Sequence, residues 1–198
     1  LEKLDPELIK EMRDYYFNQI KSYKKDKEKE ITIDKMPLNI VHVGEIVRFF
    51  PNAKFILALR HPYDCVLSCF MQNFMLNHAM ANFLNLNDSS NLYNLTMSLW
   101  KKYTSVYKFD YHIIKYEDVI SNFDKTIKNL LYFLNVSWSD NVTEFYKTAE
   151  KRGIINTPSY NQVSQPIYSN SMYRWKNYEK EFENSKDKLE TWVKEFNY

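Results

Sequence analysis

The chain has 198 residues, of which 44% are hydrophobic, so it can bury a sizeable core and is not a disordered protein. Its 27 lysines and arginines nearly balance its 25 aspartates and glutamates, which excludes the broad basic surface of a nucleic-acid-binding protein. No apolar run approaches the length of a membrane span and no apolar signal segment is present. We therefore expect a soluble, cytoplasmic protein without membrane insertion, built as one domain over residues 1–198.

Glycine, cysteine and histidine are scarce, and this scarcity excludes several kinds of site. With only Gly44 and Gly153, the chain cannot contain the glycine-rich phosphate loops G-x-x-x-x-G-K-[ST] or G-x-G-x-x-G. Cys65 and Cys69, four residues apart on one predicted helix, do not suit a disulfide and are too few for a structural zinc site. The four histidines show no metal-binding spacing, so we expect no metal.

Hydrophobic periodicity predicts an alternation of helices and strands. An amphipathic helix is expected over residues 5–23, a short strand over 31–34, a helix over 40–50 and a strand over 55–59. This β–α–β order is the unit that builds parallel sheets, so it predicts an α/β fold with helices flanking the sheet. Further along, we expect helices over residues 62–75, 92–107, 123–134, 138–152 and 186–196 and a third strand over 111–115. An irregular or weakly helical segment is expected over 78–86, and a non-helical segment over 157–170.

A candidate anion-binding site follows the strand over residues 55–59. This strand is entirely apolar, as expected for a parallel strand covered on both faces, and Arg60 stands at its carboxyl end, where α/β sheets bind ligands. Pro62 suits the first position of the next helix, and Ser68 places a hydroxyl in its second turn. A guanidinium fork, a helix start and a hydroxyl together suit a phosphate. The alternative, left open here, is that Arg60 caps the strand edge and Ser68 packs within the helix.

Other polar side chains are expected near the same sheet edge. Lys35 follows the predicted strand over residues 31–34 and Tyr116 follows the one over 111–115, so both are expected to meet Arg60 in one crevice. Arg174 and Lys176 flank an aromatic residue after a long polar segment. They predict either a flap that closes over an anion or a surface aromatic with basic neighbours.

Five segments, in this order along the chain, resemble the sulfotransferase family. They are DKMPLN at Asp34–Asn39, FPNAK at Phe50–Lys54, RHPYDCVLS at Arg60–Ser68, KYED at Lys115–Asp118 and the segment from Thr157 to Trp175. The likeness covers about residues 1–182 and is strongest to bacterial sulfotransferases that carry tetratricopeptide repeats and to tyrosylprotein sulfotransferases. It implies a P-loop-NTPase-like sulfotransferase fold with a parallel sheet flanked by helices.

The resemblance also implies an activity. The family moves a sulfuryl group from 3′-phosphoadenosine 5′-phosphosulfate (PAPS) to a hydroxyl, without a metal. Arg60 and Ser68 would hold the 3′-phosphate of this donor. Lys35 would stabilise charge on the bridging or sulfuryl oxygens as the sulfate leaves, and Ser159 would lie near the 5′-phosphate and the sulfuryl group. Tyr116 would contact the adenine–ribose side.

The same resemblance places the basic segment from Arg174 to Lys176 against the phosphates. An in-line transfer needs positioned cations and hydrogen-bond donors more than covalent chemistry from the protein, which agrees with these roles. The acceptor would be a hydroxyl-bearing protein tyrosine, sugar or small molecule, and the sequence does not choose among them.

The chain also departs from the family pattern. The first strand and the loop that binds the 5′-phosphosulfate, rich in glycine, serine and threonine, are absent, as is the glutamate base that follows this loop in tyrosylprotein sulfotransferases. Cytosolic members carry a histidine two residues after the lysine, where this chain has Pro37, so no general base is identified. The pattern matches the C-terminal two-thirds of a catalytic domain, and we expect the chain by itself to be inactive or nearly so. An upstream tetratricopeptide-repeat region would fit the resemblance.

Two other interpretations remain. A relative of P-loop kinases would share the sheet, but the missing phosphate loop and the pair Arg60 and Ser68 argue against it. A non-catalytic protein-interaction domain on a degenerate α/β scaffold would account for the many aromatic residues, 17% of the chain.

Overall fold

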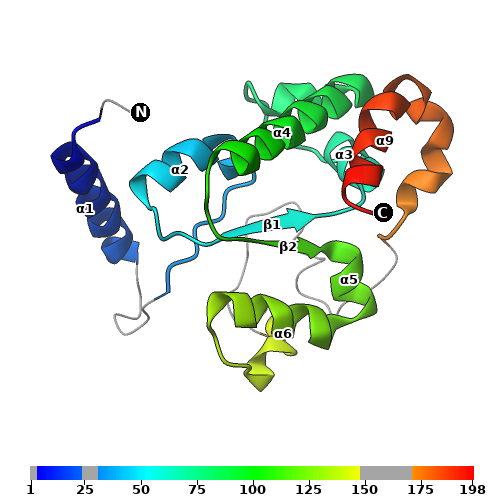
Figure 1. The fold of residues 1–198 in the computed structure, drawn as a ribbon. Coiled ribbons are helices and arrows are strands. Elements are labelled where there is room, and N and C mark those ends of the chain that lie inside the picture. The colour runs from blue at the N-terminus through cyan, green and yellow to red at the C-terminus, as the bar shows by residue number, and fades with distance from the viewer. Residues whose placement is uncertain (1–3, 24–30, 148–170) are drawn as a thin grey trace. The chain divides into compact units, whose positions relative to one another are not determined.

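A computed structural model describes residues 4–23, 31–147 and 171–198 of the chain. Contacts divide it into two compact units (Figure 1). Unit 1 comprises Leu1–Phe55 and Thr96–Tyr111, and unit 2 comprises Ile56–Leu95 and His112–Tyr198. The expectation of a single domain stays a prediction.

Unit 1 is helical. It contains α1 (Pro6–Tyr23), the 3-10 helix η1 (Asn39–His42), α2 (Val43–Phe49) and residues 96–106 of α4 (Leu86–Val106). The helix α1 begins where its sequence predicts, because Asp5 Oδ1 accepts a hydrogen bond from the Glu7 amide at 3.1 Å and caps the first turn. Its aromatic face packs on α2 through Tyr16 and Phe17, whose rings lie 5.0 and 5.7 Å from the ring of Phe50. The predicted helices over residues 5–23 and 40–50 are thus confirmed, the second beginning as a 3-10 turn.

The predicted strand over residues 31–34 is wrong. These residues are extended but pair with no strand in the described part of the chain, where the sheet consists of β1 and β2 alone. Ile31 and Ile33 are 57% and 78% exposed, so their alternation with polar residues does not mark a buried face. A strand needs a partner for its backbone groups, and a local sequence pattern cannot supply one.

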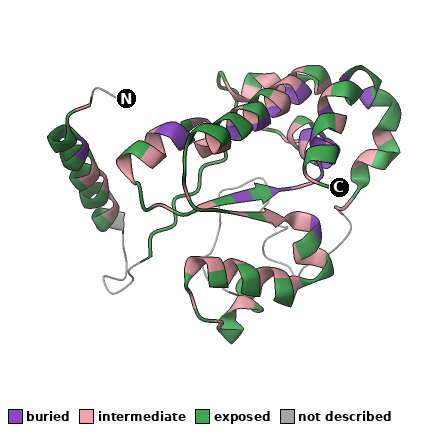
Figure 2. Ribbon diagram, viewed as in Figure 1, coloured by how far each residue is buried: buried purple, intermediate pink, exposed green. Residues whose placement is uncertain are grey.

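The two strands of unit 2 have the predicted bounds. β1 (Phe55–Leu59) and β2 (Tyr111–Lys115) lie side by side and run in the same direction, so the fold is mixed α/β with a small parallel sheet (Figure 1). The expectation that β1 is covered on both faces is wrong. Leu57 and Leu59 are 7% and 4% exposed, whereas Ile56 is 40% exposed, so only one face of the strand is buried (Figure 2).

Helices follow both strands. α3 (Pro62–Phe70) follows β1, and α5 (Tyr116–Ser121) and α6 (Phe123–Leu134) follow β2, with the 3-10 helix η2 (Met80–Leu84) between α3 and α4. α3 is shorter than the predicted helix over residues 62–75, and α4 begins six residues before the predicted Leu92. The early start has a local cause: Asn85 caps α4, since its Oδ1 accepts the Asp88 amide at 2.8 Å and its Nδ2 donates to the Asp88 carboxylate.

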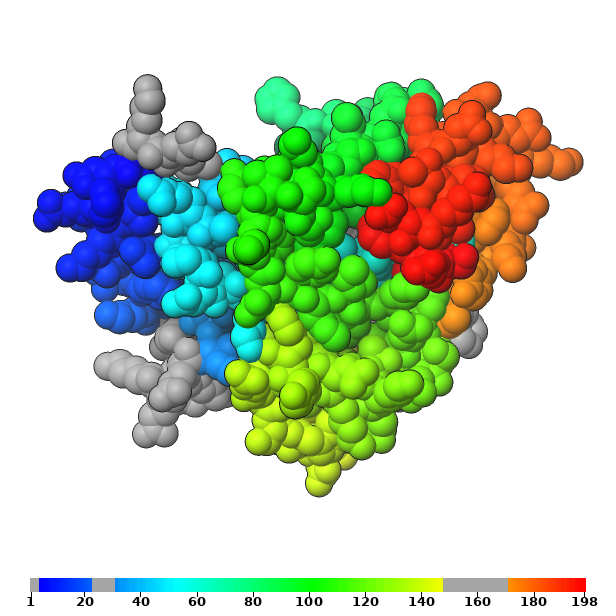
Figure 3. Space-filling model, viewed as in Figure 1, coloured from blue at the N-terminus to red at the C-terminus, as the bar shows by residue number. Residues whose placement is uncertain are grey.

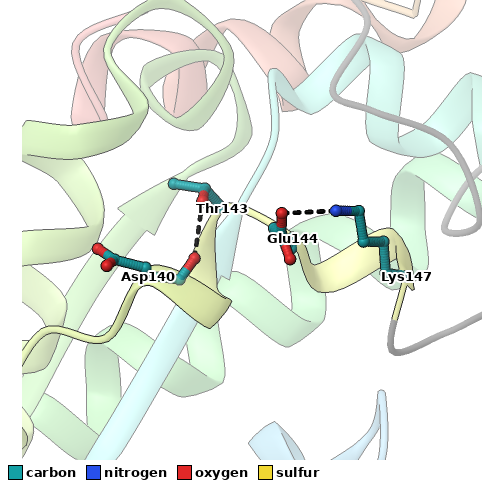
Figure 4. A network of polar contacts seen from close by, with 4 residues as sticks. All are labelled: Asp140, Thr143, Glu144 and Lys147. Atoms are coloured by element: carbon teal, nitrogen blue, oxygen red, sulfur yellow. Dashed lines mark hydrogen bonds and ion pairs between the residues drawn. The ribbon is translucent and has the colours of Figure 1, made fainter.

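The predicted helix over residues 138–152 begins later than expected, because residues 138–144 form no α-helix and only residues 145–147 of its described part are α-helical. A short 3-10 helix, η3 (Asp140–Val142), stands there instead, and the hydroxyl of Thr143 donates to the Asp140 carbonyl at 2.7 Å (Figure 4). Lys147 pairs with Glu144 at 2.6 Å just beyond it. Local bonds from such hydroxyl groups compete with the α-helical pattern. Residues 148–152 of this predicted helix, and the predicted non-helical segment over 157–170, lie outside the described residues.

The C-terminal segment completes the core of unit 2. It consists of the 3-10 helix η4 (Arg174–Ser185) and α9 (Lys186–Glu195), which confirms the predicted terminal helix. Phe182, Leu189 and Trp192 are 1%, 0% and 4% exposed. The Trp192 indole donates to Asn94 Oδ1 at 2.9 Å, which fixes α9 beside the first half of α4 (Figure 3). Burying these three side chains contributes most to holding the end of the chain against α3.

Candidate functional site

The turn between β1 and α3 is fixed from both sides. Pro62 occupies the first turn of α3, where its missing N–H costs nothing, and the Cys65 amide donates to the His61 carbonyl at 2.9 Å. The His61 amide donates to Glu117 Oε1 at 2.9 Å. Glu117 comes from α5 and is 6% exposed, so a buried carboxylate holds the backbone directly after Arg60.

A pocket opens at this turn, entirely within unit 2. Seven residues line it: Arg60, Asp64, Leu67, Ser68, Met71, Ser171 and Arg174. It encloses about 300 Å³, open solvent at its mouth included. Two guanidinium groups, two serines and one carboxylate thus face a small space floored by apolar side chains. This composition suits a compact anion that is recognised by several hydrogen bonds.

Arg60 is half-buried and only partly paired. One terminal nitrogen donates to the Ser171 carbonyl, and the guanidinium carbon lies 5.0 Å from the centroid of the Tyr116 ring. Its Nε atom is buried, and no residue in the described part of the chain forms a hydrogen bond with it. Arg60 therefore keeps a donor for a ligand while its other contacts fix the guanidinium plane.

Asp64 is a member of the pocket that sequence reasoning missed. It is 1% exposed, and its Oδ1 accepts the backbone N–H of Trp175 at 2.8 Å. Its Oδ2 is buried and has no partner among residues 4–23, 31–147 and 171–198. From the sequence, Asp64 reads only as an acid that favours the positive end of α3. Its partner lies 111 residues further along the chain, which no local pattern reveals.

An aromatic cluster packs behind the pocket. The Trp175 indole stacks on the ring of Tyr63, at 4.5 Å and 25°, and on the imidazole of His61, at 5.1 Å and 15°. Burial lowers the pKa of His61, against the opposing effect of the nearby carboxylates of Asp64 and Glu117. Because the neutral imidazole is favoured, His61 acts here as a packed aromatic ring and adds no positive charge to the site.

The two cysteines stand on the same helix as Ser68. Cys65 and Cys69 are both free, in agreement with the expectation that they form no disulfide. A hydrogen bond from Cys65 lowers the pKa of the Cys69 thiol, and Arg60 adds to this effect. The same bond, together with burial, raises the pKa of the Cys65 thiol.

The predicted site residues fall into three groups. Arg60, Ser68 and Arg174 line one pocket, and Tyr116 contacts Arg60 from α5. The ammonium group of Lys176 lies 5.1 Å from the centroid of the Tyr173 ring, and this lysine does not line the pocket.

Lys35 and Ser159 form the third group. Lys35 belongs to unit 1, where it is exposed in the extended segment beside Asp34. Asp34 in turn accepts the Tyr16 hydroxyl at 2.8 Å, and burial together with this bond raises the pKa of Tyr16 to about 12. Ser159 lies outside the described residues. The expected meeting of Lys35 with Arg60 therefore stays a prediction, as does the role of Ser159.

The described residues contain neither a cluster of metal ligands nor a helix suited to a membrane. Within residues 4–23, 31–147 and 171–198, no three side chains of histidine, cysteine, aspartate or glutamate gather as metal ligands would. None of the helices described there is both long and apolar enough to span a bilayer.

Comparison with known proteins agrees with the fold. The model of the sulfotransferase family matches residues 2–140, so the chain belongs to this family. A protein of Aquifex aeolicus (strain VF5), described only as uncharacterized, is 30% identical over 179 residues, which are 90% of this chain. The chain spans 23% of the length of that relative.

A solved structure supports the same fold. The sulfotransferase domain from the curacin biosynthetic pathway superposes with a TM-score of 0.63 at 16% identity, covering 90% of this chain and 67% of that domain. The resemblance inferred from the five sequence segments is thereby confirmed at the level of family and fold.

Proposed function

We propose that the chain binds PAPS and takes part in transferring its sulfuryl group to a hydroxyl. The observation that carries the proposal is the pocket at the carboxyl end of β1, where Arg60, Ser68 and Arg174 come together. The family relationship supports a transferase, and this pocket supplies the chemistry that the 3′-phosphate of the donor requires.

The charges of the pocket suit a phosphate dianion. Arg60 and Arg174 contribute two positive charges and Asp64 one negative charge, which leaves a net charge of one positive unit among the lining residues. The unpaired Nε of Arg60 points to a hydrogen bond still to be made, and the hydroxyl of Ser68 offers another. Charge-assisted bonds of this kind contribute roughly 1.5–3 kcal/mol each.

The remaining roles follow the family resemblance. In this proposal Tyr116 contacts the adenine–ribose side, Lys176 approaches the phosphates, and Lys35 and Ser159 stabilise charge on the transferring group. The protein binds and orients the donor, and its cations offset the charge that develops on the leaving sulfate oxygen. The acceptor would be a hydroxyl-bearing protein tyrosine, sugar or small molecule. An upstream tetratricopeptide-repeat region and a cytoplasmic location stay predictions.

The proposal is tested by nucleotide binding. Titration calorimetry on the 198-residue chain should show tighter binding of adenosine 3′,5′-bisphosphate than of adenosine 5′-monophosphate, because only the former carries the 3′-phosphate. Arg60→Ala should weaken bisphosphate binding by about 10- to 100-fold and leave the monophosphate nearly unchanged, as expected for one charge-assisted contact.

Arg48→Ala is the matched control. Arg48 also donates to a backbone carbonyl, that of Leu4 at 3.5 Å, but it lies in unit 1, outside the pocket. It should leave both affinities unchanged. Equal affinity of the unaltered chain for the two nucleotides would overturn the proposed function.

A further inference from the structure

We propose that Asp64 is a positioning residue, which fastens the C-terminal segment to α3 and thereby holds Arg174 in the anion pocket. This inference rests on the proposed function, because it concerns the same pocket. It adds a residue whose role is to place a phosphate-binding group that comes from the far end of the chain.

The first fastening is a hydrogen bond. Asp64 Oδ1 accepts the Trp175 amide at 2.8 Å, and Trp175 directly follows Arg174. Asp64 itself is 1% exposed and lines the pocket that Arg174 also lines. The bond is part-buried, and it fixes the backbone within one residue of Arg174.

The second contact that holds the C-terminal segment is the aromatic stacking of the Trp175 indole. Trp175 stacks on Tyr63 and His61, which stand at the start of α3 on either side of Pro62. Backbone and indole of Trp175 are thus both held by the first turn of α3. Rotation of the segment about the Asp64 bond would require these stacked rings to separate.

The backbone before Arg174 needs such support. Tyr173 adopts the left-handed conformation, with φ at 54°, which is unfavourable for a residue with a side chain. Contacts on both sides hold it there, since Arg60 donates to the Ser171 carbonyl and Asp64 accepts the Trp175 amide. Both acceptor–donor pairs join the β1–α3 turn to residues 171–175. Removing the Asp64 bond frees one end of this short span.

A buried carboxylate is an uncommon choice for a purely structural bond. Asp64 Oδ2 is shielded from solvent and pairs with no residue in the described part of the chain, and Arg60 and Arg174 line the same pocket. Placed among two arginines, the carboxylate offsets their mutual repulsion before a phosphate arrives. This effect favours a pocket that is formed in advance of its ligand.

The test is a double-mutant cycle on the affinity for adenosine 3′,5′-bisphosphate relative to adenosine 5′-monophosphate. Arg174→Ala and Asp64→Ala should each lower this ratio by about 10-fold. The double variant should lower it no further than Arg174→Ala alone, because Asp64 acts through Arg174. Asp64→Asn should retain most of the ratio, since its amide oxygen can still accept the Trp175 N–H. Where Asp64→Ala does not fold, Asp64→Ser, whose hydroxyl is too short for the bond, replaces it.

Glu190→Ala separates positioning from general stability. Glu190 on α9 accepts the Tyr63 hydroxyl at 3.0 Å, which also joins the C-terminal segment to α3 but outside the pocket. This variant should lower the melting temperature without changing the ratio. The proposal would be overturned if the losses of the two single variants multiplied in the variant that carries both Asp64→Ala and Arg174→Ala. An unchanged affinity ratio in Asp64→Ala would overturn it as well.

Hydrogen exchange on the ligand-free chain distinguishes this inference from the proposed function. Asp64→Ala should speed exchange of the Trp175 amide at least 10-fold, whereas Asp64→Asn should not. If the unaltered chain shows no preference for the bisphosphate, the proposed function fails, and exchange alone then decides whether Asp64 holds the segment. Unchanged exchange of the Trp175 amide in Asp64→Ala would show that Asp64 does not hold the C-terminal segment, and would refute this inference.

Discussion

The bond between Glu117 and the His61 amide makes a direct prediction about stability. Glu117→Ala removes the side chain that accepts this buried N–H, and the turn that carries Arg60 loses its hydrogen bond to α5. Leaving a buried donor unpaired costs about 1–3 kcal/mol, and removing an acid from the first turn of a helix adds a few tenths. We expect a loss of about 2 kcal/mol.

Glu117→Gln should lose less. Its amide oxygen can still accept the His61 N–H, and the buried side chain no longer carries a charge, so part of the cost of burying a charge disappears. We expect a loss of less than about 1 kcal/mol. The neighbouring Asp118 is exposed and stands in the same first turn of α5, so Asp118→Ala controls for the effect of the helix dipole.

The assay is thermal unfolding followed by circular dichroism at neutral pH. A loss of about 2 kcal/mol corresponds to a fall of roughly 4–8 °C in the melting temperature for a chain of this size. The expected order of melting temperatures is unaltered chain, then Glu117→Gln, then Glu117→Ala. A Glu117→Ala variant as stable as Asp118→Ala would refute the reasoning that this bond holds the turn.

Two further predictions concern other parts of the molecule. Because burial lowers the pKa of His61 below its ordinary value in spite of Asp64 and Glu117, the unfolded chain takes up a proton before the folded chain does. Stability should therefore fall as the pH drops from about 7.5 to about 5.5, and the fall should be smaller in His61→Phe, as urea unfolding at the two pH values would show; equal slopes would contradict it. In unit 1, a Cβ at Gly44 would lie 3.0 Å from Tyr103 Cε1, so Gly44→Val should cost about 1–3 kcal/mol in thermal unfolding, and an unchanged melting temperature would argue against this packing.

Those parts of the fold that depend on neighbouring residues were predictable from the sequence. The strands at Phe55–Leu59 and Tyr111–Lys115 have the predicted bounds. The first is an apolar run closed by Lys54 and Arg60, and the second holds a tyrosine and two isoleucines, residue types that favour strands. Arg60 and Ser68 were placed on one pocket by the same local logic, since a strand end, a turn and two helical turns fix their relative positions.

Features that depend on distant partners were not predictable. The segment at residues 31–34 alternates apolar and polar residues as a strand does. Whether it forms a strand depends on whether another strand lies beside it. Asp64 looked like an ordinary acid near a helix start, because its partner at Trp175 is far away in sequence. Ser171, whose carbonyl accepts a bond from Arg60, carries no local signal at all.

The early end of α3 and the late start of the helix predicted after Trp138 are intermediate cases. After Trp138 the hydroxyl of Thr143 bonds a nearby carbonyl, so a weak local preference delays the helix that the hydrophobic pattern predicts. Such boundaries are the least certain product of any periodicity argument.

A crystal structure of the chain with adenosine 3′,5′-bisphosphate tests the central claim most directly. We expect the 3′-phosphate within hydrogen-bonding distance of the Nε of Arg60 and the hydroxyl of Ser68, with the Arg174 guanidinium on its other side. A bisphosphate bound elsewhere, with the pocket at the end of β1 left to solvent, would contradict the account.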